Sequence, residues 1–155
     1  LLSHVDGSLS PLHLAIDESK LEVVKLLLSN SNAKSLMNLA RSSDGMFPLI
    51  SSCEHGNLEM VKVLVEAGVN VNQIVHITPD ISKCNDVTVR ERDQATAVWW
   101  AAKCGHAQVV DFLLTNGADP KPVPKYFEQF SIRLAAYSLS KSFDVVAILD
   151  KHSVA

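Results

Sequence analysis

Several features that define other protein classes are scarce or missing in this chain of 155 residues. Its three cysteines, Cys53, Cys84 and Cys104, are an odd number at irregular spacing, which is not the pattern of a disulfide framework. No apolar run approaches the roughly 18–20 residues that a membrane span needs. The opening stretch, LLSHVDGSLS, has neither the basic region nor the apolar core of a secretory signal. These absences predict a cytoplasmic or nuclear protein that is not inserted in a membrane.

A concentration of positive charge is also missing. The chain has 14 Lys and Arg against 17 Asp and Glu, a net charge of −3, and no Lys/Arg-rich run. Neutralising phosphates requires clustered basic side chains, so the sequence argues against nucleic-acid binding. The hydrophobic fraction of 47% and the charged fraction of 20% are those of a folded protein with a buried core.

An internal repeat is present instead. Four stretches align with one another: SPLHLAIDESKLEVVKLLLSN from residue 10, FPLISSCEHGNLEMVKVLVEAG from residue 47, TAVWWAAKCGHAQVVDFLLTNG from residue 96 and the weaker IRLAAYSLSKSFDVVAILDKH from residue 132. Their anchors lie 37, 49 and 36 positions apart, at Pro11, Pro48, Ala97 and Arg133. From each anchor to an apolar pair (Val23-Val24 in the first copy) the distance is always 12 positions. A constant interior with variable joins predicts rigid units connected by adjustable loops.

Each unit is predicted to hold two short helices. Ser10 can cap the first helix and Pro11 suits its first position, and Thr96 offers the same cap in the third unit. The second helix has an apolar stripe at helical spacing, and Gly68 and Gly117 suit the left-handed conformation that ends it. Helices under about 12 residues are not stable alone, so we expect the units to stack.

The phrases SPLHLA, GNLEMVKVLVEAGVNVN and GHAQVVDFLLTNGADP resemble the ankyrin repeat, a unit of about 33 residues with a turn and two helices. The resemblance covers nearly the whole chain and implies an all-α ankyrin-repeat solenoid with β-turn or hairpin fingers. It divides a single domain, residues 1–155, into units at about 5–41, 42–72, 91–126 and 127–155, with an insertion at 73–90. Because the chain lacks an initiator Met and opens within the pattern, we expect it to be a piece of a longer protein.

The insertion predicts an extended finger or loop at about 73–94. Two short β-type runs, 74–77 and 87–90, flank the turn-like TPDISKCN and suggest a hairpin. Two interpretations stay open. The insertion is either a tolerated surface loop, since long loops cost little entropy, or a contact element, since loops often carry binding.

Candidate chemistry is better explained by the repeat than by catalysis. Cys104 and His106 are two positions apart, and Gly105-His106 matches the turn into the second helix. Cys53 and His55 suggest a second half of a zinc site, but Cys104 aligns with His55 rather than with Cys53. There is no Gly-rich phosphate loop and no Ser-His-Asp pattern. We therefore expect no catalytic residue, no metal and no cofactor.

The resemblance implies a non-catalytic module that binds a peptide or a folded protein through a concave groove and finger loops. The groove would be acidic toward the first two units and more basic toward the third, and a monomer is favoured. Trp99 replaces the His of the first unit's SPLH and would pack in the core or reach a partner. The alternative is a structural or regulatory spacer of a larger enzyme or channel. The candidate contact residues are Asp17, Glu18, Asp44, Met46, Glu54, His55, Arg90, Arg92, Asp93, Trp99 and Lys103.

Overall fold

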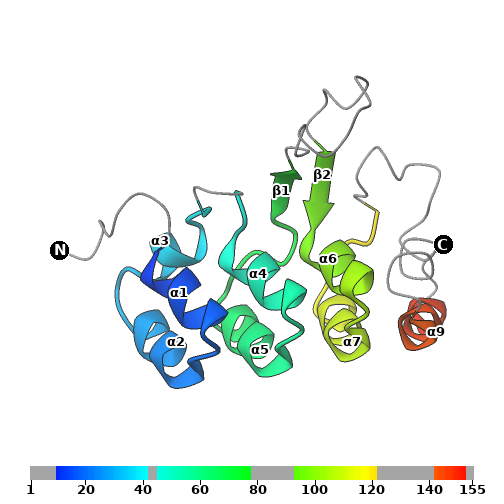
Figure 1. The fold of residues 1–155 in the computed structure, drawn as a ribbon, viewed down its shortest axis with the longest axis horizontal. Coiled ribbons are helices and arrows are strands. Elements are labelled where there is room, and N and C mark those ends of the chain that lie inside the picture. The colour runs from blue at the N-terminus through cyan, green and yellow to red at the C-terminus, as the bar shows by residue number, and fades with distance from the viewer. Residues whose placement is uncertain (1–9, 42–44, 78–92, 122–141, 153–155) are drawn as a thin grey trace.

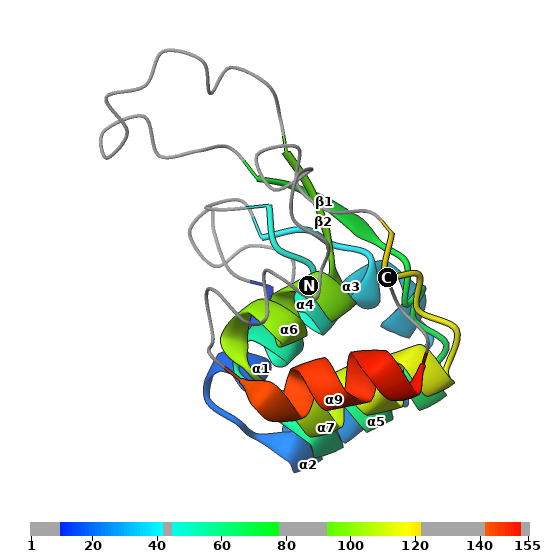
Figure 2. The same cartoon turned by 90° about the vertical axis from the view of Figure 1, so that its right-hand side faces the viewer.

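The computed structural model describes residues 10–41, 45–77, 93–121 and 142–152. Its helices form two rows (Figure 1). The first helices of successive units stand side by side in one row, and the second helices stand beneath them in the other. The view along the rows shows the last helix in line with the second helices (Figure 2). This is the predicted all-α solenoid of stacked helix pairs.

The first unit consists of α1 (Pro11–Asp17) and α2 (Leu21–Leu28). A short helix, α3 (Ala33–Met37), follows in the join to the second unit. The sequence predicts only an irregular turn there. Met37 of α3 is buried, so this short helix also contributes to the core.

The next two units repeat the pair. They are α4 (Pro48–Glu54) with α5 (Leu58–Glu66), and α6 (Ala97–Cys104) with α7 (Ala107–Thr115). Helix α9 (Phe143–Lys151) packs against α7 and corresponds to the second helix of the predicted fourth unit. The predicted first helix of that unit lies outside the described residues.

A two-stranded antiparallel stem precedes the third unit. Strand β1 (Ile74–Ile77) pairs with β2 (Asp93–Thr96), with Ile74 opposite Thr96 and Ile77 opposite Asp93. The first strand is where the sequence predicts it, but its partner is not the run at 87–90, which lies outside the described residues. Thr96 ends β2 and is also the N-cap residue of α6, so the stem leads directly into the third unit.

Local turn chemistry explains the helix ends. Ser10 caps α1 by accepting a hydrogen bond from the His13 backbone N–H, and Pro11 occupies the first helical position. Thr96 occupies the equivalent position in α6 but makes no side-chain cap. Gly105, Gly68 and Gly117 have φ of 82°, 88° and 84°, the left-handed region where a Cβ is unfavourable. The predicted glycine turns are confirmed.

The core runs between units, and the apolar pair of each second helix supplies much of it. Val24, Val61 and Val110 are all fully buried at the same register. Such aliphatic side chains each contribute about 1.5–3 kcal/mol when fully removed from water. Because each helix pair alone would leave this stripe in solvent, the units depend on one another.

Candidate functional site

The C-terminal ends of the first helices form one row across three units. Each unit contributes two neighbouring residues to this row. They are Asp17-Glu18, Glu54-His55 and Lys103-Cys104, at equivalent positions in successive repeats. Helix α1 packs on α4 and α4 packs on α6, which puts these ends side by side. Glu18, Glu54 and His55 are exposed, and Asp17 and Lys103 are partly buried. The row therefore changes from acidic to basic along the array.

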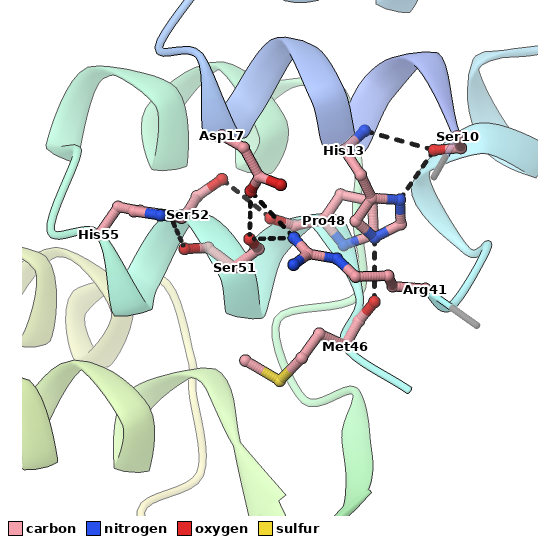
Figure 3. Close-up of polar contacts among 9 residues, drawn as sticks. All are labelled: Ser10, His13, Asp17, Arg41, Met46, Pro48, Ser51, Ser52 and His55. Carbon is pink, nitrogen blue, oxygen red and sulfur yellow. Dashed lines mark hydrogen bonds and ion pairs between the residues drawn. The ribbon is translucent and has the colours of Figure 1, made fainter. Parts of the chain in front are cut away.

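Asp17 is held by an inter-unit ion pair (Figure 3). Arg41 Nη2 donates to Asp17 Oδ1 at 2.9 Å and to Ser51 Oγ at 2.9 Å, and Ser51 Oγ donates to Asp17 Oδ1 at 3.2 Å. The charges are mostly shielded from solvent, so the geometry has to satisfy them locally. Asp17 therefore ties the first unit to the second, a role that its position in the sequence does not reveal.

His13 connects the same two units (Figure 3). Its Nε2 lies 2.9 Å from the Met46 carbonyl oxygen, and its Nδ1 lies 2.8 Å from Ser10 Oγ. A carbonyl only accepts, so Nε2 carries the proton, and Nδ1 accepts from the serine hydroxyl. The ring is fully buried and acts as a structural bridge.

The tryptophans lie at the equivalent register of the third unit. Trp99 is 2% exposed and belongs to the core, so it offers no surface to a partner. Trp100 is partly buried and meets Trp99 edge to face, with centroids 5.4 Å apart. Lys103 Nζ lies 4.1 Å from the Trp100 ring centroid, a cation–π contact. The ammonium group of Lys103, at the basic end of the row, therefore rests on the Trp100 ring.

The cysteine–histidine pairs lack the properties of an active site. Burial raises the pKa of the Cys53 thiol far above its usual range, and nearby Cys104 adds to the effect. Burial also raises the pKa of Cys104; Glu54 raises it further and Lys103 opposes this. Reactive cysteines need the opposite shift, because the thiolate is the nucleophile. Both thiols therefore stay protonated at neutral pH.

The two histidines near them have structural bonds. His106 Nε2 donates to the Glu54 carbonyl at 2.9 Å, across the boundary between units, and His55 Nδ1 donates to the Ser51 carbonyl at 2.8 Å. Within the described segments, no three His, Cys, Asp or Glu side chains gather in a way that could hold a metal ion.

The remaining candidate contact residues are buried, lie in a strand or fall outside the described residues. Met46 is 5% exposed, so burial removes it from the contact set, as it does Trp99. Asp93 lies in β2, paired with Ile77. Asp44, Arg90 and Arg92 lie outside the described residues.

Asn72 links two units, a role that the sequence patterns do not predict. Its Nδ2 donates to the Gly117 carbonyl at 3.2 Å, and its Oδ1 accepts from the Asp119 backbone N–H at 2.7 Å. The signal available was the recurrence of similar turn phrases, GVNVN and GADP, after α5 and α7. These turns contact each other directly.

In the segments described, every helix is too short or too polar to cross a bilayer.

Comparisons with known proteins agree with the stacked helix pairs. Residues 1–75 match the family model described as ankyrin repeats (3 copies), and residues 93–123 match the ankyrin repeat model. The chain is 32% identical to the palmitoyltransferase AKR1 of Lachancea kluyveri over 116 residues, which is 74% of this chain and 13% of that protein. It is 30% identical to the human transient receptor potential cation channel subfamily A member 1 over 132 residues, 85% of this chain and 10% of the channel. It is also 32% identical to the mouse serine/threonine-protein kinase TNNI3K over 93 residues, 60% of this chain and 10% of the kinase.

The chain thus spans about a tenth of the length of these relatives. The two family-model matches together cover most of the chain. The chain belongs to the ankyrin repeat family.

Proposed function

We propose that this array binds a peptide or protein segment along the row of first-helix ends, next to the β1–β2 stem. Ankyrin repeats are non-catalytic interaction modules, so the open question is which surface serves here. The exposed acidic ends of α1 and α4 and the Lys103 end of α6 would select a ligand of opposite polarity, basic at one end and acidic at the other.

The observation that carries this proposal is the register of Glu54 and Lys103. They occupy the same repeat position in adjacent stacked helices, yet they have opposite charge. Neither charge appears in an ion pair within the described residues, whereas Asp17 at the same position is bound to Arg41. Lys103 is also positioned by the Trp100 ring, which reduces the side-chain entropy that binding would cost.

A double charge-reversal variant tests whether the row of first-helix ends binds the ligand. Peptides selected on this chain from a displayed random library would be measured against a variant with Glu54→Lys and Lys103→Glu together. We expect at least a tenfold loss of affinity, or about 1.4 kcal/mol, since like charges brought together at an interface cost several kcal/mol.

A matched control exists on the opposite row. Glu59 and Lys62 form an exposed ion pair on α5, with 2.8 Å between Oε1 and Nζ. The exchange of Glu59→Lys and Lys62→Glu leaves net charge unchanged, as the first pair does. Equal binding by the two charge-exchanged variants would place the ligand elsewhere and reject the row.

The stem permits an equally sharp test of the insertion. Because Ile77 pairs with Asp93, residues 78–92 can be replaced by Asn-Gly, a two-residue turn that closes a hairpin without disturbing the stem. Loss of the selected peptides with an unchanged melting temperature would make the insertion part of the binding surface. Full retention would restrict binding to the helices.

A second candidate function is supported by the relatives. Their printed names are those of a transferase, a channel and a kinase, and this chain matches only a small part of each. We propose as the alternative that the array is a regulatory or structural segment of a larger enzyme or channel. A parent protein without any catalytic or channel region would contradict it.

A further inference from the structure

An unusually apolar surface occurs on the outer side of the first unit. Leu14 is 53% exposed, Val23 46% and Leu26 72%. All three belong to α1 and α2, on the helix pair that begins the described array. Scattered exposed apolar residues are ordinary, but these three share one helix pair, and Leu14 and Val23 occupy repeat positions that are buried in the second unit, at Ser51 and Met60.

The repeat positions of Val23 and Leu27 are buried in every later unit that the structure describes. Met60, Val109 and Val145 occupy the position of Val23, and each is buried. Leu64, Leu113 and Leu149 occupy the position of Leu27; all three are fully buried, whereas Leu27 is partly exposed. Ser51 occupies the position of Leu14 and bonds Asp17 of the preceding unit. These positions therefore face the preceding unit, and in the first unit they face no described helix pair.

We propose that the face formed by Leu14, Val23, Leu26 and Leu27 is a stacking interface for one further ankyrin helix pair on the N-terminal side of α1. A repeat that ends an array has a polar outer face, which keeps it soluble, and this face is aliphatic. The family match also begins at residue 1, ahead of the first described helix. The surface thus corresponds to the face with which α5, α7 and α9 each pack on the preceding second helix.

The partner's chemistry follows from the units that already stack. The side that faces a following unit presents a buried valine in the second helix of each, namely Val24, Val61 and Val110. An incoming pair would place an aliphatic side chain at that register, against Val23 and Leu27.

The chain supplies such a pair for the test. A copy of residues 45–70, which contains α4 and α5, can be joined directly before Leu1. The copied Pro48 then stands 33 positions before Pro11, matching the repeat length of about 33 residues. If the face is a stacking interface, the fused pair and the array should melt in one transition, with the midpoint raised by about 5 °C or more.

Val23→Glu identifies the interface in this fusion. It should remove the gain, while in the 155-residue chain it should shift the midpoint no more than Lys25→Gln does. Lys25→Gln changes net charge equally at an exposed site of the same helix. Met60→Glu, at the covered register, should destabilise both chains strongly.

Three results would overturn the proposal. The fused pair could melt separately, Val23→Glu could have the same effect in both chains, or the 155-residue chain could form a dimer that Val23→Glu dissociates. The last result, read by light scattering, would assign the face to a second copy.

Discussion

Helices α1 and α6 begin at the same repeat position, but different side chains stabilise their first turns. In α1, Ser10 and His13 form a hydrogen-bonded chain that ends on the Met46 carbonyl of the next unit. In α6, Thr96 and Trp99 occupy those positions. Thr96 Oγ1 is buried and has no hydrogen-bond partner among the described residues, while the Trp99 indole is buried in the core.

The difference shows that one repeat position can be stabilised either by a buried hydrogen bond or by the burial of a large apolar side chain. The imidazole of His13 satisfies a buried carbonyl, whose desolvation would otherwise cost about 1–3 kcal/mol. The indole of Trp99 buries more apolar area but leaves the hydroxyl of Thr96 unsatisfied. Substitutions at these positions should therefore differ in size and even in sign.

Trp99→Ala should have the largest effect, a loss of about 3–5 kcal/mol, because it opens a cavity at the centre of the array. Trp99→His should cost less, since an imidazole at this register can meet Thr96 as His13 meets Ser10. Urea unfolding of the two variants measures the difference. If Trp99→His were as costly as Trp99→Ala, the register would not support the polar arrangement of α1.

The turn between the two helices gives a second contrast. Ser19, Gly56 and Gly105 occupy equivalent positions and all have positive φ, 54°, 69° and 82°. A Cβ on Gly56 would overlap the His106 ring, which bonds the Glu54 carbonyl. Gly56→Ala should therefore cost about 2–3 kcal/mol, from left-handed strain and the lost inter-unit bond.

Ser19→Gly should have the opposite sign. It relieves the left-handed strain of a residue with a Cβ, with an expected gain of about 0.5–1 kcal/mol. Thermal unfolding of Ser19→Gly and Gly56→Ala tests both. A destabilised Ser19→Gly variant would mean that the serine side chain contributes more than its backbone costs.

The capping residues provide the third contrast. Ser10→Ala removes a helix cap and the bond to His13, and should cost about 1–2 kcal/mol. Thr96→Val keeps the shape but removes a buried, unsatisfied hydroxyl, so stability should stay equal or rise by about 1 kcal/mol. Chemical unfolding of both variants settles the sign. A comparable loss in Thr96→Val would show that this hydroxyl is satisfied in solution.

Much of this fold could be predicted from the sequence. The 12-position spacing predicts the helix pairs, and Gly68, Gly105 and Gly117 predict turns that the structure confirms. These features are local, because capping and left-handed turns depend on a few neighbouring residues. The repeat therefore specifies each unit well.

The contacts between units could not be predicted as well. Asp17 fits an exposed groove residue in the sequence, but Arg41, 24 positions later, binds it. Trp99 stays ambiguous until the adjacent helices are placed. The partner of β1 is also missed, because β1 pairs with residues 93–96, directly before α6, and not with the run at 87–90. Each case depends on residues far apart in sequence, which periodicity does not relate.

The two ends of the array give the last and smallest contrast. Asp17 in the first unit is shielded, whereas Asp111 on α7 binds Lys151 Nζ at 2.9 Å and His152 Nε2 at 2.8 Å in more exposed ion pairs. Hydrogen bonds from His152 and then Lys151 lower the pKa of the Asp111 carboxyl. A lowered folded-state pKa means that this stabilisation is complete above the unfolded value, about 3.9, and is lost as pH falls through the folded value.

Acidification should therefore loosen α9 before the other helices. Amide hydrogen exchange in residues 143–151, followed from pH 6 to pH 3, measures the loosening against α5 in the same molecule. Asp111→Asn should remove the extra pH dependence, and high salt should reduce it, because exposed pairs are screened. If α9 and α5 responded alike in both chains, Asp111 would not anchor the last helix.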